Sequence, residues 1–178
     1  VLTMQEQSID EEELYKGLEK AVNGALLQFK ETKELEGENL KTDLNLKLDN
    51  MLNKVEVIIE RSPIIVEEHK NKVEAKVREF LEDSQIDEAR IVQEMVLFAE
   101  KICTDEETVR LKSHIIHMKD SLNAKEEGIG RKLDFIAQEM NREANTILSK
   151  ANDIEVSNYA IELKTEIEKV REQIQNIE

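Results

Sequence analysis

The sequence has very little of what turns, sheets and aromatic cores are usually made from. Its 178 residues include one proline, five glycines and no tryptophan, and aromatic residues make up only 3%. Tight turns and hairpins commonly need glycine or proline, and strands are enriched in aromatic and β-branched residues. These shortages argue against a β-sheet protein, while the abundance of Glu, Lys, Leu and Ile favours helices around an aliphatic core.

Cysteines and long hydrophobic runs are equally scarce. Cys103 is the only cysteine, so no intramolecular disulfide can form, which fits a reducing cytoplasm. No segment approaches the roughly 18 apolar residues that a membrane-spanning helix requires. Residues 1–4 resemble neither a signal peptide nor a natural start. We therefore expect a cytoplasmic protein without membrane contacts, whose sequence begins inside a longer protein.

Positive charge is also in deficit. The 25 Lys and Arg residues are outnumbered by 40 Asp and Glu residues, which gives a formal net charge of −15. Such a chain repels phosphates at long range, which excludes a protein that coats nucleic acid through bulk attraction. A local basic site or a bound cation is compatible with this charge.

Apolar residues recur at the three- and four-residue spacing of amphipathic helices. We predict an all-α fold of long amphipathic helices in antiparallel hairpins, a helical bundle with coiled-coil character and six or seven helices. Residues 1–178 should form a single all-helical region. The last helix, from about Asp153 onward, has the clearest seam, because its apolar residues alternate steps of four and three. The seams consist of Leu14, Leu18, Val22, Ala25 and Phe29; Leu44, Leu48, Met51, Val55 and Ile58; Ile91, Met95, Phe98 and Ile102; Leu111, Ile115, Met118 and Leu122; Leu133, Ile136, Ala137, Met140, Ala144 and Ile147; and Val156, Ala160, Leu163, Ile167, Val170, Ile174 and Ile177.

Capping and helix-breaking residues predict where these helices begin and end. Helix starts are expected at residues 8–13 and 104–107, where a hydroxyl side chain precedes acidic residues. Ser62 before Pro63 predicts a boundary, with proline at the first helical position. Residues 36–38 would interrupt or loosen a helix, and residues 83–85 mark a further break.

The segment 131–150 departs from the pattern of an ordinary bundle helix. A line of polar residues, mostly small, runs beside its apolar seam, and Asn, Ser and Asp each cost a helix roughly half a kcal/mol per position. Buried hydrogen bonds between helices would explain this line, and so would a polar ligand. The segment carries four basic residues against three acidic ones, so it is locally non-acidic. The polar line consists of Asp134, Gln138, Asn141, Asn145 and Ser149.

Two groups of side chains could carry chemistry. Glu139 and Glu143 lie one helical turn apart, and such a pair either belongs to a salt-bridged surface or ligates a hard cation such as Mg²⁺ or Mn²⁺. His114 lies at the edge of an apolar seam beside Arg110. It is either a catalytic acid or base, or a hydrogen-bond donor to phosphate, or else an ordinary structural histidine. A zinc pair formed by His114 and His117 lacks a third ligand at a recognisable spacing.

A set of motifs runs through the whole chain and is densest in its final third. They are Glu36-Gly37 and Leu40; Arg90-Ile91 with Gln93-Glu94; Glu106-Glu107, Arg110-Leu111 and Ser113-His114; residues 130–135, 138–143, 145–146 and 149–150; and Lys164, Glu168, Arg171, Gln173 and residues 175–178. Together they resemble the motifs of the YicC family of bacterial endoribonucleases, in which His117 has no counterpart. The family's N-terminal domain, which contains β-structure, is not matched, so the resemblance implies the C-terminal helical part of a longer protein.

The resemblance implies an endoribonuclease that cleaves RNA phosphodiester bonds, depends on a divalent metal (Mn²⁺ or Mg²⁺) and forms a homo-oligomer. Glu139 and Glu143 would bind the metal. Attack by water and attack by the RNA 2′-hydroxyl both stay open. The implied catalytic residues are His114, Asp134, Glu139 and Glu143. The implied RNA-binding residues are Arg110, Arg131, Lys132, Gln138, Asn141, Arg142, Asn145 and Lys150.

Two other function classes stay beside the nuclease. A non-catalytic RNA-binding or adaptor protein would use the same Arg and Asn groups without a metal. A structural coiled-coil scaffold would explain the apolar seams but not the polar line. For the nuclease, we expect the helix of residues 131–150 to lie beside the one carrying Arg110 and His114, with both facing one polar groove.

Overall fold

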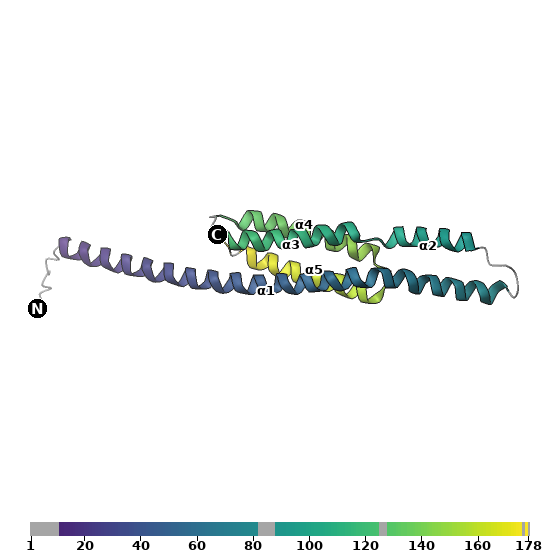
Figure 1. Cartoon of the computed structure of the whole chain (residues 1–178). Helices are drawn as coiled ribbons and strands as arrows, with labels where there is room; N and C mark the ends of the chain where they lie inside the picture. Colours follow the sequence, from purple (N-terminus) through teal and green to yellow (C-terminus); the bar gives the residue numbers. More distant parts are fainter. Residues whose placement is uncertain (1–10, 82–87, 125–127, 176, 178) are drawn as a thin grey trace, which may run out of the picture. The chain divides into compact units, whose positions relative to one another are not determined.

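Every element of the computed structural model is an α-helix over the residues that it describes, which are 11–81, 88–124, 128–175 and 177 (Figure 1). The helices are α1 (Glu11–Leu81), α2 (Glu88–Ile102), α3 (Asp105–Asn123), α4 (Gly130–Lys150) and α5 (Ile154–Ile174). The predicted all-α class is therefore confirmed for this part of the chain. None of these helices is long and apolar enough to cross a membrane.

The prediction of a helix boundary at Ser62 and Pro63 was wrong, because α1 continues through both residues. Ser62 does not cap a new helix; its hydroxyl donates a hydrogen bond of 3.0 Å to the carbonyl of Ile58 in the preceding turn. The guanidinium of Arg61 makes two hydrogen bonds, of 2.9 and 2.8 Å, to the carboxylate of Glu68 across the proline. These contacts brace the helix where proline removes one backbone donor. Residues 36–38 do not interrupt α1 either.

The described residues therefore form five helices instead of six or seven. The expected helix start at residues 8–13 is described only from Glu11, where α1 begins with three acidic residues in its first turn, and the expected break at residues 83–85 lies outside the described residues. The predicted start at Thr104 is correct, although its side chain forms no capping hydrogen bond.

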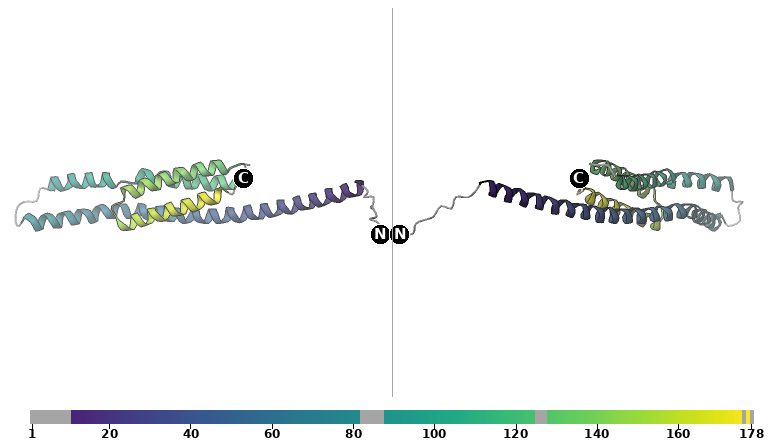
Figure 2. Two further views of the ribbon diagram at one scale, coloured as in Figure 1. Left: turned by 180° about the vertical axis from the view of Figure 1, so that it is seen from behind. Right: turned by 60° about the vertical axis from the view of Figure 1, so that its left-hand side comes forward.

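The chain divides into two units, residues 1–42 and 43–178, and each is described by itself. In the first unit the predicted stripe from Leu14 to Phe29 is helical, and its large apolar side chains are half or more exposed. In the second unit α4 packs against both α3 and α5. The part of α1 after Asp43 lies alongside α5 (Figure 2). It is tied to α3 by the Lys112–Glu56 and Lys119–Asp49 ion pairs, and to α5 by a Lys54–Glu166 hydrogen bond of 2.7 Å.

The core of the second unit is aliphatic, as the shortage of aromatic residues predicts. The four seams of α1, α3, α4 and α5 that the sequence predicts point inward, and nearly all of their side chains are completely buried. The helix α5 begins where the sequence predicts, because the carboxylate of Asp153 accepts a hydrogen bond of 3.0 Å from the backbone N–H of Val156. A coiled-coil supercoil stays a prediction. The helix α2 lies against α1, where the rings of His69 and Phe98 stack 3.6 Å apart.

The backbone of Ile177 passes close to the start of α4. A Cβ atom added to Gly130 would lie 2.6 Å from the backbone oxygen of Ile177. Real Cβ atoms do not approach this closely, so glycine at this position lets the two backbones pack together.

Candidate site between α3 and α4

Two antiparallel helices bring half of the predicted site residues to one side of the bundle. Arg110 on α3 lies 4.0 Å from the carboxylate of Glu143 on α4, and Lys150 on α4 lies 2.8 Å from the carboxylate of Glu107 on α3. Arg110 also pairs with Glu106 of its own helix. The prediction that residues 131–150 lie beside the helix of Arg110 and His114 is therefore confirmed.

The register of these pairs also places His114 opposite Glu139. His114 follows Arg110 by one helical turn, and Glu139 precedes Glu143 by one turn on the antiparallel partner, so the two lie at one level. Both side chains are half-buried. Arg142 reaches to 4.0 Å from the Glu139 carboxylate while 77% of its side chain stays exposed. We call the set Glu106, Glu107, Arg110, His114, Glu139, Arg142, Glu143 and Lys150 the α3–α4 face.

Two carboxylates of the α3–α4 face are almost completely buried. The side chains of Glu143 and Glu107 are 8% and 9% exposed. Burying a carboxylate is costly unless a cation or hydrogen-bond donor compensates its charge. Lys150 compensates one oxygen of Glu107, and this contact raises the pKa of the Lys150 ammonium. The other oxygen of Glu107 is buried with no hydrogen-bond partner among the described residues.

Sequence reasoning did not assign Glu107 to the site. It lies one turn before Leu111, so it occupies a position in the buried seam of α3. A carboxylate at a seam position was the signal that would have found it, because charged residues are rarely buried without a partner.

The polar line of α4 faces the other side, toward α5. Arg171 donates a hydrogen bond of 2.9 Å to Asp134, and Gln138 donates one of 2.7 Å to the same carboxylate. Asn141 donates one of 2.8 Å to Glu168. The Arg171 guanidinium holds the pKa of Asp134 below its usual value. Hydrogen bonds between helices thus account for Asp134 and Asn141, although the first explanation expected them to be buried and the two bonds are part-buried and exposed.

The structure does not bring Asp134 together with the other predicted catalytic residues. Asp134 and Glu143 are nine residues apart, which at about 100° per residue places them on opposite sides of α4. Arg131, Lys132 and Asn145 are exposed, the first two at the start of α4.

A metal site is not complete on the α3–α4 face. Glu139 and Glu143 share one side of α4, as predicted, but no group of three His, Cys, Asp or Glu side chains among the described residues could hold a metal ion. Hard divalent cations take six or more oxygen ligands. The described side chains could therefore supply only part of a Mn²⁺ or Mg²⁺ coordination shell.

Two hollows that sequence reasoning missed lie away from the α3–α4 face. One is lined by residues of α1 and α5 and the other by residues of α5 alone, and they share Tyr159. The sequence contained one indication of these hollows, which is the presence of Tyr159 on α5 in a chain with few aromatic residues.

Comparison with known proteins adds a family to this geometry. Residues 58–178 match the family model described as "Endoribonuclease YicC-like, C-terminal". The chain is 43% identical over 179 residues to "Probable endoribonuclease YicC" of Clostridioides difficile (strain 630), and 35% identical over 182 residues to the protein of the same name from Haemophilus influenzae. Each alignment covers 100% of this chain and 61% or 60% of the relative, so the chain spans about three fifths of their length. On this match, the chain belongs to the YicC-like endoribonuclease family.

Proposed function

We propose that this chain is the helical part of an endoribonuclease and that the α3–α4 face carries its cleavage site. The observation that supports the proposal most strongly is the pairing of Arg110 with Glu143, which puts His114 and Glu139 at one level. The face thereby combines a guanidinium for phosphate, an imidazole for proton transfer and a carboxylate within a short distance. The printed names of the two relatives agree with this activity.

The side chains suggest a division of labour on RNA. Arg142 is the most exposed cation of the face and binds a phosphate, assisted by Arg110. His114 accepts the proton of the attacking hydroxyl, which is either water or the RNA 2′-hydroxyl. The buried carboxylate of Glu143 fixes the guanidinium of Arg110 in position. Product ends distinguish the two attacks, because a 2′,3′-cyclic phosphate forms only when the 2′-hydroxyl attacks.

The metal and the assembly are further parts of the proposal. A bound Mn²⁺ or Mg²⁺ would polarise a phosphoryl oxygen, and it would need ligands besides Glu139 and Glu143, such as RNA oxygens or another chain. A homo-oligomer would cover the exposed apolar stripe of residues 14–29. The single cysteine and the bacterial relatives favour a cytoplasmic location.

Cleavage of labelled RNA by the full-length protein, with Mn²⁺ or with EDTA, tests the proposal. The variants His114→Ala, Glu139→Gln and Arg142→Ala should each lower the rate at least tenfold, or roughly 1.4 kcal/mol in the barrier. Their melting temperatures should stay near the wild-type value, because none of the three side chains belongs to the core. Arg142→Ala should also flatten the salt dependence of RNA binding.

The matched control is His117→Ala, which removes an exposed imidazole three residues further along α3. It should keep the wild-type rate. Wild-type rates in all three face variants would overturn the proposal. Tight RNA binding without any cleavage would instead favour the RNA-binding adaptor, the second function that the Arg residues of this face support.

A further inference from the structure

One aromatic ring of α4 is presented to solvent beside the α3–α4 face. Phe135 is 64% exposed, although most other apolar residues of this helix form its buried seam. It is the most exposed aromatic residue among the described side chains of the second unit, because Phe98 is stacked on His69 and Tyr159 is half-buried. The ring is therefore accessible to another flat group.

The surroundings of Phe135 are polar. On α4, whose residues are all described, no other large apolar side chain is exposed. The surface neighbours one turn away are Arg131, Gln138 and Glu139. A protein partner is usually bound by a continuous apolar patch, such as the stripe of residues 14–29. A lone ring among polar groups better matches a ligand that combines a flat apolar face with charges.

Two arginines lie along α4 on either side of the ring. Arg131 precedes Phe135 by one helical turn, or about 6 Å, and Arg142 follows it by two turns, or about 10 Å. At about 100° per residue the three side chains lie within about 40° of one another around the helix. Arg131 is exposed and makes no ion pair with a described residue. Arg142 is 77% exposed and lies 4.0 Å from its one described partner, Glu139.

The local charge is positive, although the chain as a whole is acidic. Residues 131–142 include three basic and two acidic residues. Of the two acids, Asp134 is paired with Arg171, and Glu139 lies near Arg142. The first turn of α4 contains no acidic residue, whereas those of α1, α3 and α5 do. Basic residues at the positive end of a helix dipole leave a potential that attracts anions.

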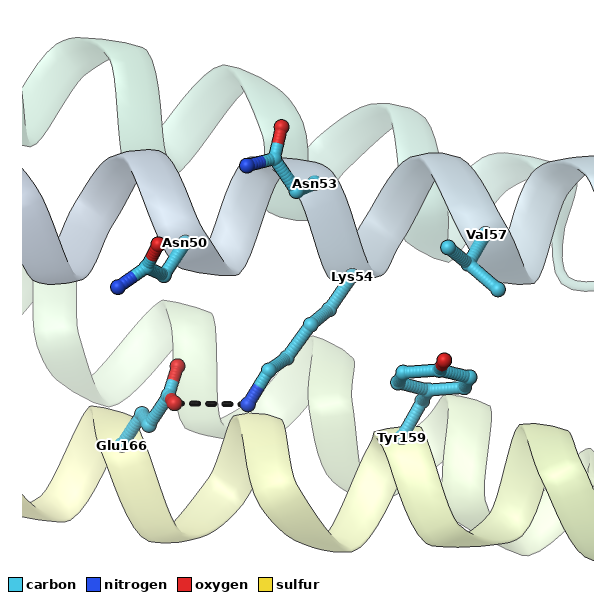
Figure 3. A pocket seen from close by; sticks show the side chains of 6 residues that line it. All are labelled: Asn50, Asn53, Lys54, Val57, Tyr159 and Glu166. Carbon is cyan, nitrogen blue, oxygen red and sulfur yellow. Dashed lines mark hydrogen bonds and ion pairs between the residues drawn. The ribbon is translucent and has the colours of Figure 1, made fainter.

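The half-buried tyrosine between α1 and α5 lacks this combination. Figure 3 shows Lys54 reaching across the hollow beside Tyr159 to Glu166, at 2.7 Å. The same ammonium is paired with Glu162 at 2.8 Å. The cation of this hollow is therefore already neutralised, whereas guanidinium groups are available beside the exposed ring of α4.

We propose that Phe135 stacks on an unpaired base of single-stranded RNA, while Arg131 and Arg142 bind phosphates on either side of that nucleotide. The choice of RNA rests on the proposed endoribonuclease function. Phe135 lies one turn, or about 6 Å, from the level of Glu139 and His114. The stacked base therefore belongs to the nucleotide next to the cleaved bond. A base inside a regular duplex is not free to stack on the ring, so the substrate is RNA that is unpaired at this point.

Fluorescence of 2-aminopurine in RNA tests the stacking, because stacking quenches this base analogue. The full-length protein carrying His114→Ala is titrated with single-stranded RNA dodecamers that each contain one 2-aminopurine at a different position. Electrophoresis confirms that the RNA stays intact, and circular dichroism confirms that each variant folds. We expect saturable quenching at one or two positions. In the protein without this change, the cleaved bond should lie next to a quenched position.

Changes of the ring separate stacking from simple apolar contact. Phe135→Leu keeps an apolar side chain, but it should raise the Kd for the single strand about tenfold and remove the quenching. Phe135→Trp should bind at least as tightly as the original ring. Phe29→Leu, which removes a 61% exposed ring in the first unit, is the control and should leave binding unchanged. The duplex form of the same RNA should bind at least tenfold more weakly, whether residue 135 is Phe or Leu.

Changes of the RNA and of the charge complete the comparison. An abasic nucleotide at the quenched position should cause the same loss as Phe135→Leu, and it should add nothing to that variant. Arg131→Gln should reduce the slope of log K against log salt by about 0.7. Arg78→Gln, at an exposed arginine of α1, is its control. In the cleaving protein, Phe135→Leu should raise KM about tenfold and change kcat less.

The outcomes distinguish this proposal from the endoribonuclease proposal. Position-specific quenching that depends on Phe135, in a protein that cleaves no RNA, would overturn only the proposed function. Unchanged RNA affinity in Phe135→Leu, or an equal loss for single strand and duplex, would overturn the stacking site. So would a change of oligomeric state in Phe135→Leu by light scattering, because the ring would then be covered by a second copy of the chain.

Discussion

Replacing Gly130 with alanine would measure how much the close approach of the C-terminal residues contributes to stability. The added Cβ would lie 2.6 Å from the Ile177 oxygen, whereas ordinary contact begins at 3.4 Å. One backbone must therefore move by about 0.8 Å, which disturbs the 2.9 Å hydrogen bond from the N–H of Ile177 to the carbonyl of Ile174. Overpacking of this kind costs about 1–3 kcal/mol, and the better helix propensity of alanine returns up to about 1 kcal/mol.

We expect Gly130→Ala to lower the free energy of unfolding by about 1 kcal/mol, or the Tm by about 2–4 °C. Thermal and urea unfolding followed by circular dichroism at 222 nm would measure both. Gly24→Ala is the control, because no atom lies within 4 Å of its added Cβ. The better helix propensity of alanine should therefore raise the stability of the helix at this position. A chain that ends at residue 176 should tolerate Gly130→Ala without loss. A Tm at or above the wild-type value, or an equal loss in the shortened chain, would refute the reasoning.

Two further predictions follow from the ion pairs of α4. Because Arg171 lowers the pKa of Asp134, the unfolded state takes up this proton first as the pH falls. The stabilisation is present above the unfolded-state pKa of about 4 and is lost as the pH drops through the lowered folded-state pKa, so Asp134→Asn should flatten the stability curve below about pH 4, as measured by urea unfolding. Lys150→Met leaves the buried Glu107 unpaired and should cost about 1–2 kcal/mol, less than for a fully buried pair because Lys150 is 34% exposed. Adding Glu107→Gln should restore most of the loss in the same assay, and an unrestored double variant would contradict the burial argument.

Helical periodicity predicted the core well because the same face of a helix must be apolar along its whole length to be buried. The seam from Leu44 to Ile58 and the seam from Val156 to Ile174 both point inward, as their spacing indicated. The start of α5 at Asp153 was predictable for a local reason, since its capping carboxylate needs only the next three residues. Periodicity cannot tell whether a partner is present, so the equally regular stripe from Leu14 to Phe29 turned out to be exposed.

The errors concern features that depend on contacts distant in the sequence. Pro63 lies inside α1, where the Arg61–Glu68 pair spans it, a seven-residue contact that a capping rule does not consider. Likewise, the polar line and the carboxylate pair of α4 face different neighbours, α5 and α3, which one helix alone cannot reveal. The match to family motifs grouped Arg110, His114 and Glu143, which the structure brings to one face, but it missed Glu107 and could not separate Asp134 from the set.

Few cations of the α3–α4 face are free to attract RNA. Arg110 lies between Glu106 and Glu143, and Lys150 is paired with Glu107, which leaves Arg142 as the most exposed cation of the α3–α4 face. Each neutralised phosphate adds about −0.7 to the slope of log K against log salt for single strands, so one or two such contacts give a shallow dependence and little affinity. Uncharged contacts such as base stacking would add affinity that an acidic surface does not oppose.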